Sequence, residues 1–430
     1  MTFAPSCRTT HGLCLMLSLG LLSLAGSLAH AADLPDEEKA ALTDDQMGYL
    51  STSVDGSVLV GLELDSAVVR YFDVWESKSF VDVESPENEL TIEGCTQPIG
   101  IFMGAQTSSS YLVYVVCGDS TDEEDDGQIY RFKLTDDSSD DGALSLTVGA
   151  VSAVESSKSL EFTAATISPD GATLYLAART SSGSTTVYSL DATDDEADLE
   201  DYSYLTTTSW EISQLAYNEF SDRLVAADTD GNVYVVVESD SALNPAFECG
   251  AAPRALLPID SSRVLMVAES KQVYAITFTG DLVTGCSGSW TLANQPSSIT
   301  RVTVDGAGNA ADALFVRTGQ AVEVYDTDSV RISPSSPTLL ATLPTTAEWT
   351  AGDKLAGSVL SRVFLSGSKG LYVLSSGPWL TLGALEEPVV VTDLSPTFSI
   401  TVTPDEDTTR IWYDLEPPFD LSLIHISEPT

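Results

Sequence analysis

A two-strand unit recurs along this chain and limits the folds open to it. Its clearest copy, residues 167–191, reads ISPDGATLYLAARTSSGSTTVYSLD: a Pro-Asp-Gly turn, a strand, a Ser/Gly/Thr-rich turn and a second strand. The same order recurs at residues 217–238 and 258–278, and four weaker copies lie outside this central part. Because apolar residues alternate between turn residues in each copy, every unit predicts a β-hairpin.

The spacing of the units predicts how the hairpins assemble. Seven residues occupy the same point of the second strand, 40 to 59 residues apart: Tyr71, Tyr130, Tyr188, Tyr234, Tyr274, Glu323 and Tyr372. An isolated hairpin is marginally stable in water, so neighbouring segments must add strands and the units must stack. Periods of this length are typical of four-stranded propeller blades. We therefore predict an all-β fold, a seven-bladed β-propeller over residues 47–384.

Further strands are expected beside the hairpins. Candidates for outer strands are Phe80–Val83, Ala143–Val148, Tyr202–Thr206, Ser289–Leu292 and Thr338–Leu343. For ring closure, either Met47–Thr52 or Trp379–Leu382 is expected to pair into a shared blade.

One repeat resembles a known type. ISPDGATLYLAA followed by VYSLD resembles the YVTN-type propeller repeat and, more loosely, the tryptophan-aspartate repeat, whose Trp-Asp dipeptide and Gly-His pair are missing here. Such propellers occur in surface-layer, scaffold and lactonase-like proteins. The resemblance implies a fold and leaves the function open.

Both ends of the chain read as segments outside the fold. Residues 1–31 have a polar start, an apolar run and the exit Ala29-His30-Ala31, which is the pattern of a secretory signal peptide. We therefore expect an exported protein in the periplasm, at the cell surface or outside the cell, with no membrane insertion. Residues 421–430, LSLIHISEPT, resemble a translated sequencing adapter, and we expect the natural protein to continue instead.

Two more segments flank the predicted propeller. Residues 32–46 form an acidic N-terminal segment. Residues 385–420 have alternating strands at Phe398–Thr403 and Arg410–Leu415. They resemble the start of a bacterial immunoglobulin-like or fibronectin-like module, a partial β-sandwich cut off after about three strands.

Charge and histidine content exclude several functions. The chain has 64 acidic and 19 basic residues, and leaving out both ends removes Arg8 and Glu428, so that 63 and 18 remain and the net charge is still −45. So negative a protein is not expected to bind nucleic acid. The three histidines, His11, His30 and His425, all lie in the end segments. The remaining part cannot use Ser-His-Asp or Cys-His catalysis or histidine-ligated zinc.

Four cysteines remain once the predicted signal peptide is set aside: Cys95, Cys117, Cys249 and Cys286. They show no C-x-x-C metal or redox spacing, and an even number in an exported chain indicates disulfides. Of three pairings, the local ones, Cys95 with Cys117 and Cys249 with Cys286, are favoured because each would join neighbouring strands. Four free thiols are the alternative.

Acidic runs are the candidates for metal binding. Runs at residues 121–127, 136–142 and 191–201 could collect carboxylates around calcium, or form solvated connections between strands, which is the favoured interpretation. No other cofactor is predicted.

The sequence DTDGN at residues 228–232 has the spacing closest to a calcium loop. The ligands would be Asp228, Asp230 and Asn232. It departs from an EF-hand, because Val233 stands at the glycine position and Ser239 at that of the bidentate acid. A hairpin turn with Gly231 or Asn232 at positive φ is the simpler interpretation.

Five tryptophans follow the repeat strands: Trp75, Trp210, Trp290, Trp349 and Trp379. They could stack on sugar rings if they converged, but their variable spacing favours packing between blades.

These observations favour a non-enzymatic propeller that acts as a binding or interaction scaffold of a secreted or cell-surface protein, with an unknown protein or glycan ligand and an unknown oligomeric state. One alternative is a hydrolase or lactonase-like enzyme with a carboxylate site in the propeller funnel. It would require a central pocket with at least two converging acids beside an aromatic wall. A calcium-dependent adhesin is the other alternative.

Overall fold

The structure of the 430-residue chain is a computed structural model. It describes residues 41–43, 47–63, 66–73, 89–107, 110–118, 127–136, 146–154, 160–180, 185–205, 211–237, 247–302, 313–319, 321–344, 354–358, 362–367, 370–375, 381–382, 389–392, 398–404 and 409–415. The predicted signal peptide at 1–31, the adapter-like tail at 421–430 and the expected strand Phe80–Val83 lie outside these residues.

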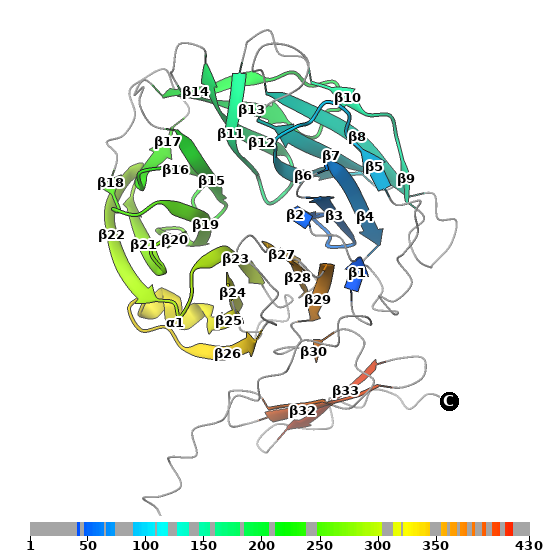
Figure 1. The fold of residues 1–430 in the computed structure, drawn as a ribbon. Coiled ribbons are helices and arrows are strands. Elements are labelled where there is room, and N and C mark those ends of the chain that lie inside the picture. Colours follow the sequence, from blue (N-terminus) through cyan, green and yellow to red (C-terminus); the bar gives the residue numbers. More distant parts are fainter. Residues whose placement is uncertain are drawn as a thin grey trace, which may run out of the picture.

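Antiparallel sheets surround a central axis, and one strand of each sheet lies nearest that axis (Figure 1). These innermost strands are β2 (Met47–Thr52), β6 (Pro98–Gln106), β11 (Leu160–Ile167), β15 (Ile212–Asn218), β19 (Pro253–Asp260), β23 (Pro296–Val302) and β27 (Lys354–Ser358). Each contacts the next, and β27 also contacts β2, so the ring is closed. The prediction of an all-β propeller is confirmed.

Six blades are each built from strands that are consecutive in the sequence. Their second strands are β3 (Val58–Glu63), β7 (Ser110–Cys117), β12 (Thr173–Thr180), β16 (Arg223–Asp228), β20 (Arg263–Ala268) and β24 (Ala313–Thr318). The third strands are β4 (Val68–Asp73), β8 (Gln128–Asp136), β13 (Thr185–Asp191), β17 (Asn232–Val236), β21 (Gln272–Thr279) and β25 (Ala321–Asp326). The outer strands are β5 (Glu89–Thr91), β9 (Leu146–Val148) with β10 (Ser152–Ala153), β14 (Glu200–Leu205), β18 (Phe247–Glu248), β22 (Leu282–Thr291) and β26 (Leu339–Pro344). A short helix, α1 (Thr327–Ile332), connects β25 to β26.

The remaining sheet of the ring is composite, so six blades are built from consecutive strands where seven blades were predicted. Next to β27 lie β28 (Arg362–Gly367) and β29 (Gly370–Ser375). The outer edge of β29 pairs with β1 (Ala41–Thr43) and with β30 (Thr381–Leu382). Because a ring has to join its two ends, this closing sheet takes strands from both. Its N-terminal strand comes from upstream of the predicted start at residue 47, and its last strand falls in the expected segment Trp379–Leu382.

The repeat alignment corresponds to one position in every sheet of the ring. All seven aligned residues lie on the third strand of their sheet, from Tyr71 on β4 to Tyr372 on β29. Four of the five expected outer strands overlap β9, β14, β22 and β26. The period-2 pattern therefore located the hairpins correctly, including the hairpin that carries Glu323.

Hydrophobic clusters fill the spaces between neighbouring blades. On β7, Val113 and Val115 pack toward the first blade, while Tyr114 and Val116 pack toward the third. On β16, Ala226 and Ala227 divide in the same way between two neighbours. Alternate residues of a strand face opposite sides of its sheet, so a blade flanked by two others buries both faces.

Two turns between first and second strands have the same construction. Asp55 and Asp170 each accept a bond from the hydroxyl of the serine two positions earlier, at 2.6 and 2.5 Å. The next residues, Gly56 and Gly171, have φ of 73° and 71°, a conformation that favours glycine. These turns and the corresponding connections of other blades define one side of the ring, which we name the turn face.

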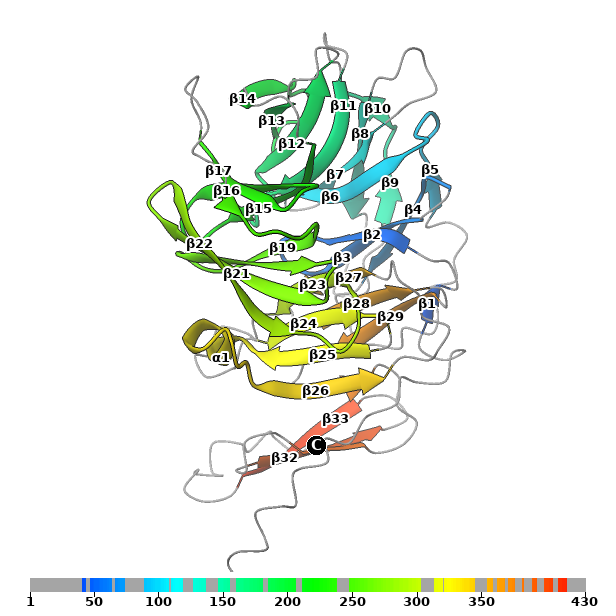
Figure 2. The same ribbon diagram turned by 60° about the vertical axis from the view of Figure 1, so that its left-hand side comes forward.

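A separate three-stranded antiparallel sheet follows the propeller. It comprises β31 (Val389–Thr392), β32 (Phe398–Pro404) and β33 (Thr409–Leu415), in the order β31-β32-β33 (Figure 2). Both strands expected in residues 385–420 are present. An immunoglobulin-like or fibronectin-like identity for this sheet stays a prediction.

Ring closure depends on a buried hydrogen-bonding serine. Ser366 on β28 is fully buried, accepts a bond from the Met47 backbone nitrogen at 2.7 Å and donates to the Met47 carbonyl at 2.9 Å. We expect Ser366→Ala to lower the free energy of unfolding by about 1–3 kcal/mol, because two buried backbone groups lose their partner. Chemical unfolding measures this. The control, Ser270→Ala at an exposed turn, should leave the free energy of unfolding almost unchanged. Equal losses of stability in the two variants would contradict the role of Ser366.

Buried tyrosines predict sensitivity to alkali. Burial raises the pKa of Tyr114 above its usual 10.0, and its hydroxyl has no hydrogen-bond partner among the described residues. The unfolded tyrosine therefore ionises first, so stability is retained below about pH 10 and lost above it. We expect Tyr114→Phe to be neutral at pH 8 and to flatten the loss of stability between about pH 10 and 11. Unfolding by urea at several pH values measures this, and parallel pH profiles would contradict it.

Candidate functional site

A cavity lies at the centre of the ring, enclosed by innermost strands. Its volume is about 340 Å³, within the range of small-ligand sites. It is lined by Tyr49, Leu50, Ile99, Gly100, Ile101, Phe102, Thr163, Ala164, Ala165, Ser213, Gln214, Leu215, Arg254, Ala255, Ser297 and Ser298. Six strands contribute, namely β2, β6, β11, β15, β19 and β23. Uncharged hydroxyl and amide groups dominate its polar lining.

The same irregularity occurs on all six of these strands. One extra residue interrupts the pairing with the second strand near the start of each innermost strand. The bulged residues are Gly48, Ile99, Thr163, Ser213, Arg254 and Ser297. All except Gly48 line the central cavity. A β-bulge bends its strand and redirects a side chain, so the repeat builds a ring of variable residues around the axis.

A backbone hydrogen bond fixes the bulge in four blades. The residue after the second strand donates its N–H to the carbonyl two positions before the bulged residue. The pairs are Gly118 to Gln97 at 2.8 Å, Thr229 to Glu211 at 3.0 Å, Glu269 to Ala252 at 3.1 Å and Gly319 to Gln295 at 3.1 Å. The side of the ring that carries these groups lies across the blades from the turn face, and we name it the entry face.

Two cavities open on the entry face. The larger, about 670 Å³, contains an ion pair in which Arg254 Nη2 lies 2.6 Å from Glu269 Oε1. Its other lining residues are Ser213, Gln214, Thr229, Ala252, Pro253, Gln295, Pro296 and Ser297. The smaller, about 410 Å³, is lined by Gln97, Ile99, Gly118, Glu161, Phe162, Thr163 and Glu211. Because Arg254, Ser213 and Ser297 line both the larger cavity and the central one, the entry face leads toward the axis.

Two acids meet in the smaller cavity. Arg179 Nη1 lies 3.9 Å from Glu161 and 3.8 Å from Glu211. The two carboxylate side chains are 55% and 46% exposed, and the aromatic ring beside them, Phe162, is buried. A general acid needs a carboxyl held in an apolar surrounding. An exposed pair bound to a guanidinium lacks that surrounding, so this pair provides little support for the enzyme hypothesis.

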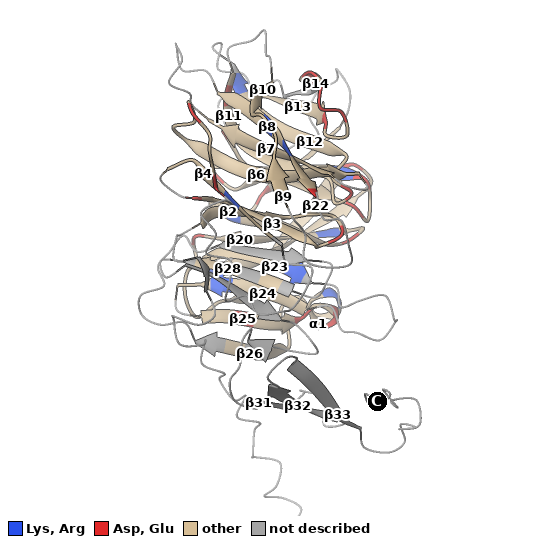
Figure 3. Cartoon of the chain, turned by 90° about the vertical axis from the view of Figure 1, so that its right-hand side faces the viewer, with Lys and Arg blue, Asp and Glu red and all other residues tan. Residues whose placement is uncertain are grey.

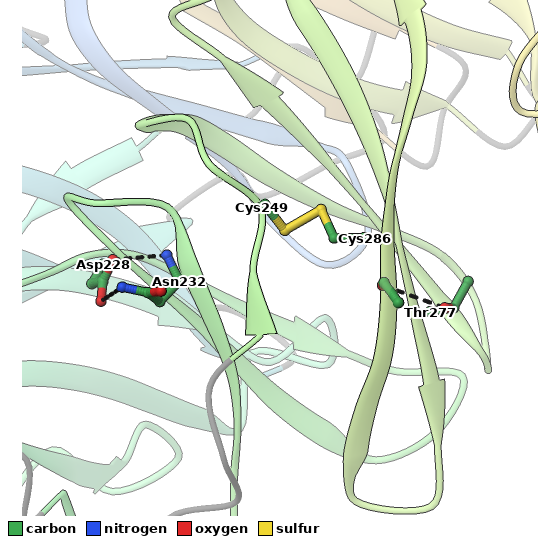
Figure 4. The surroundings of a disulfide bond; sticks show 6 residues. Asp228, Asn232, Cys249, Thr277 and Cys286 are labelled. Atoms are coloured by element: carbon green, nitrogen blue, oxygen red, sulfur yellow. Dashed lines mark hydrogen bonds between the residues drawn. A yellow bond between two sulfur atoms is a disulfide. The ribbon is translucent and has the colours of Figure 1, made fainter.

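The calcium candidate forms a tight hairpin turn (Figure 4). Asp228 is fully buried, and its oxygens accept four hydrogen bonds of 2.9 Å, from the Asp230 and Asn232 backbone nitrogens, the Asn232 amide and the Tyr234 hydroxyl. Gly231 has φ of 86°, and a Cβ there would lie 2.3 Å from the Ala251 carbonyl oxygen. This geometry is that of the hairpin interpretation, with Gly231 at positive φ.

Calcium would have to displace these donors. The Asp230 side chain points to solvent as an exposed residue, and no group of three or more His, Cys, Asp or Glu side chains within the described ranges could hold a metal. We expect the same melting temperature with 5 mM calcium, roughly 100 times a 50 µM Kd, as with chelator. Calorimetry with magnesium as control tests this. A rise with calcium alone would contradict it.

One acidic run is fully within the described residues, at 191–201. It connects β13 to β14 and is held to the second blade, where Arg131 Nη1 donates to the Ala197 carbonyl at 2.8 Å and Lys133 pairs with Asp195. Most of the runs at 121–127 and 136–142 lies outside the described residues. Figure 3 shows the described acids mainly at strand ends and connections.

The cysteines lie in two close pairs that join neighbouring blades. Cys95 and Cys117 have Cα atoms 5.6 Å apart and link the segment after β5 to the end of β7. Cys249 and Cys286 have Cα atoms 5.5 Å apart and link the segment after β18 to β22 (Figure 4). Both separations are normal for disulfides. The structure thus supports the two local pairings.

The described tryptophan side chain belongs to the core. Trp290 is 8% exposed and packs with Tyr325 of the next blade, with ring centroids 5.4 Å apart. Trp75, Trp210, Trp349 and Trp379 lie outside the described residues. Trp290 therefore packs between blades, as the spacing favoured.

Sequence reasoning did not identify Arg254, Glu269 or the ring of bulges. A signal for the bulges is present, because Pro98, Pro253 and Pro296 each stand directly before a bulged residue at the start of an innermost strand. Proline is accepted at the first residue of a strand.

Comparisons with known proteins identify no function for this chain. No protein-family model matches the chain, and no curated protein matches it in sequence. A crystal structure of BBS1N in complex with ARL6DN, soaked with mercury, is similar over 79% of this chain and 93% of that chain, with 16% identity and a TM-score of 0.49. A likeness of that size leads to no conclusion about ligand or partner. Within the described residues no helix is long and apolar enough to cross a bilayer.

Proposed function

We propose that this protein is an exported, non-enzymatic binding scaffold whose ligand enters the central cavity from the entry face. The observation that carries the proposal is the continuity of the 670 Å³ entry cavity with the 340 Å³ central cavity through shared lining residues. Six of the seven innermost strands carry the same bulge, and in five of them the bulged residue lines the central cavity, so the scaffold is constant while that residue varies.

The lining of these cavities suits recognition better than catalysis. Gln214, Gln295, Ser213 and Ser297 offer groups that both donate and accept hydrogen bonds. The two disulfides are consistent with an oxidising compartment. The signal peptide, the secreted or surface location and the immunoglobulin-like module at 385–420 belong to the same proposal.

Arrays of immobilised peptides and glycans test this function. The full chain is compared with Ser213→Trp, which fills the central cavity, and with Thr284→Trp on the outer strand β22 as control. We expect bound array members to be lost with Ser213→Trp and kept with Thr284→Trp, with equal melting temperatures. Mass spectrometry should show captured ligands intact.

Three results would contradict the proposal. They are no binding by the unaltered chain, binding that survives the filled cavity, and chemical conversion of captured ligands. Conversion would favour the enzyme hypothesis.

A further inference from the structure

Arg254 is the only charged side chain among the described residues that line the central cavity. It is a cation in a chain where 64 acids face 19 bases. Its side chain is 46% exposed and also lines the entry cavity, so it can be reached from the entry face.

The fold does not require this charge. In three other blades the bulged residue is Ile99, Ser213 or Ser297, and the residue after the second strand is Gly118, Thr229 or Gly319. These blades form the same bulge and the same backbone hydrogen bond with uncharged residues at both positions. The Arg254–Glu269 pair is therefore a feature of one blade. It occupies two positions at which the other blades carry different side chains.

Glu269 already shows how a carboxylate binds there. Its Oε1 lies 2.6 Å from Arg254 Nη2, and it is the ion-pair partner of Arg254 among the described residues. A guanidinium has five N–H donors and binds carboxylates bidentately. Arg254 can accordingly exchange Glu269 for an incoming carboxylate, or hold both.

The surrounding groups fit a peptide. The amide groups of Gln214 and Gln295 can pair with backbone N–H and C=O groups. The entry cavity around Arg254 has no aromatic lining residue among those described, so a sugar ring held there would find no face to stack on, whereas Tyr49 and Phe102 line the central cavity.

We propose that Arg254 receives a carboxylate of a peptide ligand in these cavities, with Glu269 as the built-in competitor. This inference rests on the proposed function and names its ligand class. The net charge of −45 opposes an approaching anion. Salt at 0.15 M screens charges beyond about 8 Å, so the affinity for a carboxylate depends mainly on its contact with Arg254.

Isothermal titration of the full chain at 0.15 M salt tests the inference with acetyl-Ala-Ala-Ala, carrying a free carboxylate, and its C-terminal amide. We expect the acid to bind at least about tenfold more tightly than the amide. Arg254→Gln should abolish that preference. Glu269→Gln should strengthen binding of the acid about threefold or more and leave the amide unchanged, because the competitor is gone.

Charge-matched controls lie on the turn face. Arg223→Gln and Glu219→Gln change the net charge by the same amounts at sites remote from the cavity, and both should leave the affinities within about twofold, since a remote single charge is screened. Acetyl-Ala-Glu-Ala-amide separates a side-chain carboxylate from a terminal one, and Arg254-dependent binding of either supports the inference.

Several outcomes overturn the inference. These are the absence of Arg254-dependent binding of both the terminal carboxylate of acetyl-Ala-Ala-Ala and the side-chain carboxylate of acetyl-Ala-Glu-Ala-amide, tighter Arg254-dependent binding of D-galacturonate, or binding of acetyl-Ala-Lys-Ala-amide that Glu269→Gln weakens. If array binding is still lost with Ser213→Trp, the proposed function stands and only the carboxylate assignment fails. If the filled cavity changes nothing on the arrays, both fail.

Discussion

Asp228→Ala is expected to lower the free energy of unfolding by about 3–5 kcal/mol, because it removes the fully buried acceptor of four hydrogen bonds. Two of the donors are backbone nitrogens, and the others are the Asn232 amide and the Tyr234 hydroxyl. All of them lie in the hairpin between β16 and β17, whose residues pack against both neighbouring blades. Calorimetry should show a fall in melting temperature on the order of 10 °C.

Two further variants keep this prediction testable if Asp228→Ala does not fold. Asp228→Asn preserves the shape and loses one acceptor oxygen, so it should fold with an intermediate loss. Asp230→Ala, at the exposed position of the same turn, should change stability by less than about 0.5 kcal/mol. If Asp230→Ala destabilised the protein as much as Asp228→Ala, the hydrogen bonds accepted by Asp228 would not explain the contribution of this turn to stability.

Removal of either disulfide is expected to cause the second large loss of stability. The bonds close loops with sequence separations of 22 and 37 residues. In the chain-entropy description this corresponds to about 3 and about 4 kcal/mol respectively. Each bond also joins two neighbouring blades, so its loss should weaken the packing between those two blades. Denaturant unfolding of Cys95→Ala/Cys117→Ala and of Cys249→Ala/Cys286→Ala measures both.

The two bonds should also differ in accessibility. Cys95 and Cys117 are 8% and 0% exposed, whereas Cys249 and Cys286 are only partly buried. Mild reductant under native conditions, followed by alkylation and mass spectrometry, should label Cys249 and Cys286 first. Because thiolate attack requires access to a sulfur, simultaneous labelling of all four would contradict this arrangement, as would a double variant that unfolds like the unaltered chain.

The local parts of this fold could be predicted from the sequence. Turn residues and period-2 alternation depend on neighbouring residues, so the third strands from Tyr71 to Tyr372 were located correctly. The closing sheet was only partly predictable. Pairing of Ala41 with Tyr372 joins segments far apart in the chain and leaves no short-range pattern.

Side-chain roles were harder to predict. Acids at alternating positions suggested a cation at residues 228–232, yet the Asp228 oxygens accept bonds from donors two, four and six residues later. The preference of Asp for such local bonds was the available signal. Arg254 and Glu269 meet because a bulge and a turn bring them together, and their sequence separation alone does not indicate this.

Hydrogen–deuterium exchange of the full chain, with and without the tightest-binding array member, tests whether a ligand occupies the central cavity. Bulged residues interrupt the ladder of strand pairing, so their surroundings should respond to an occupied cavity. We predict slower exchange confined to the lining of the central cavity, at residues 49–50, 99–102, 163–165, 213–215, 254–255 and 297–298. Protection confined to the turn face around Gly56 and Gly171, or no protection in the inner strands, would contradict it.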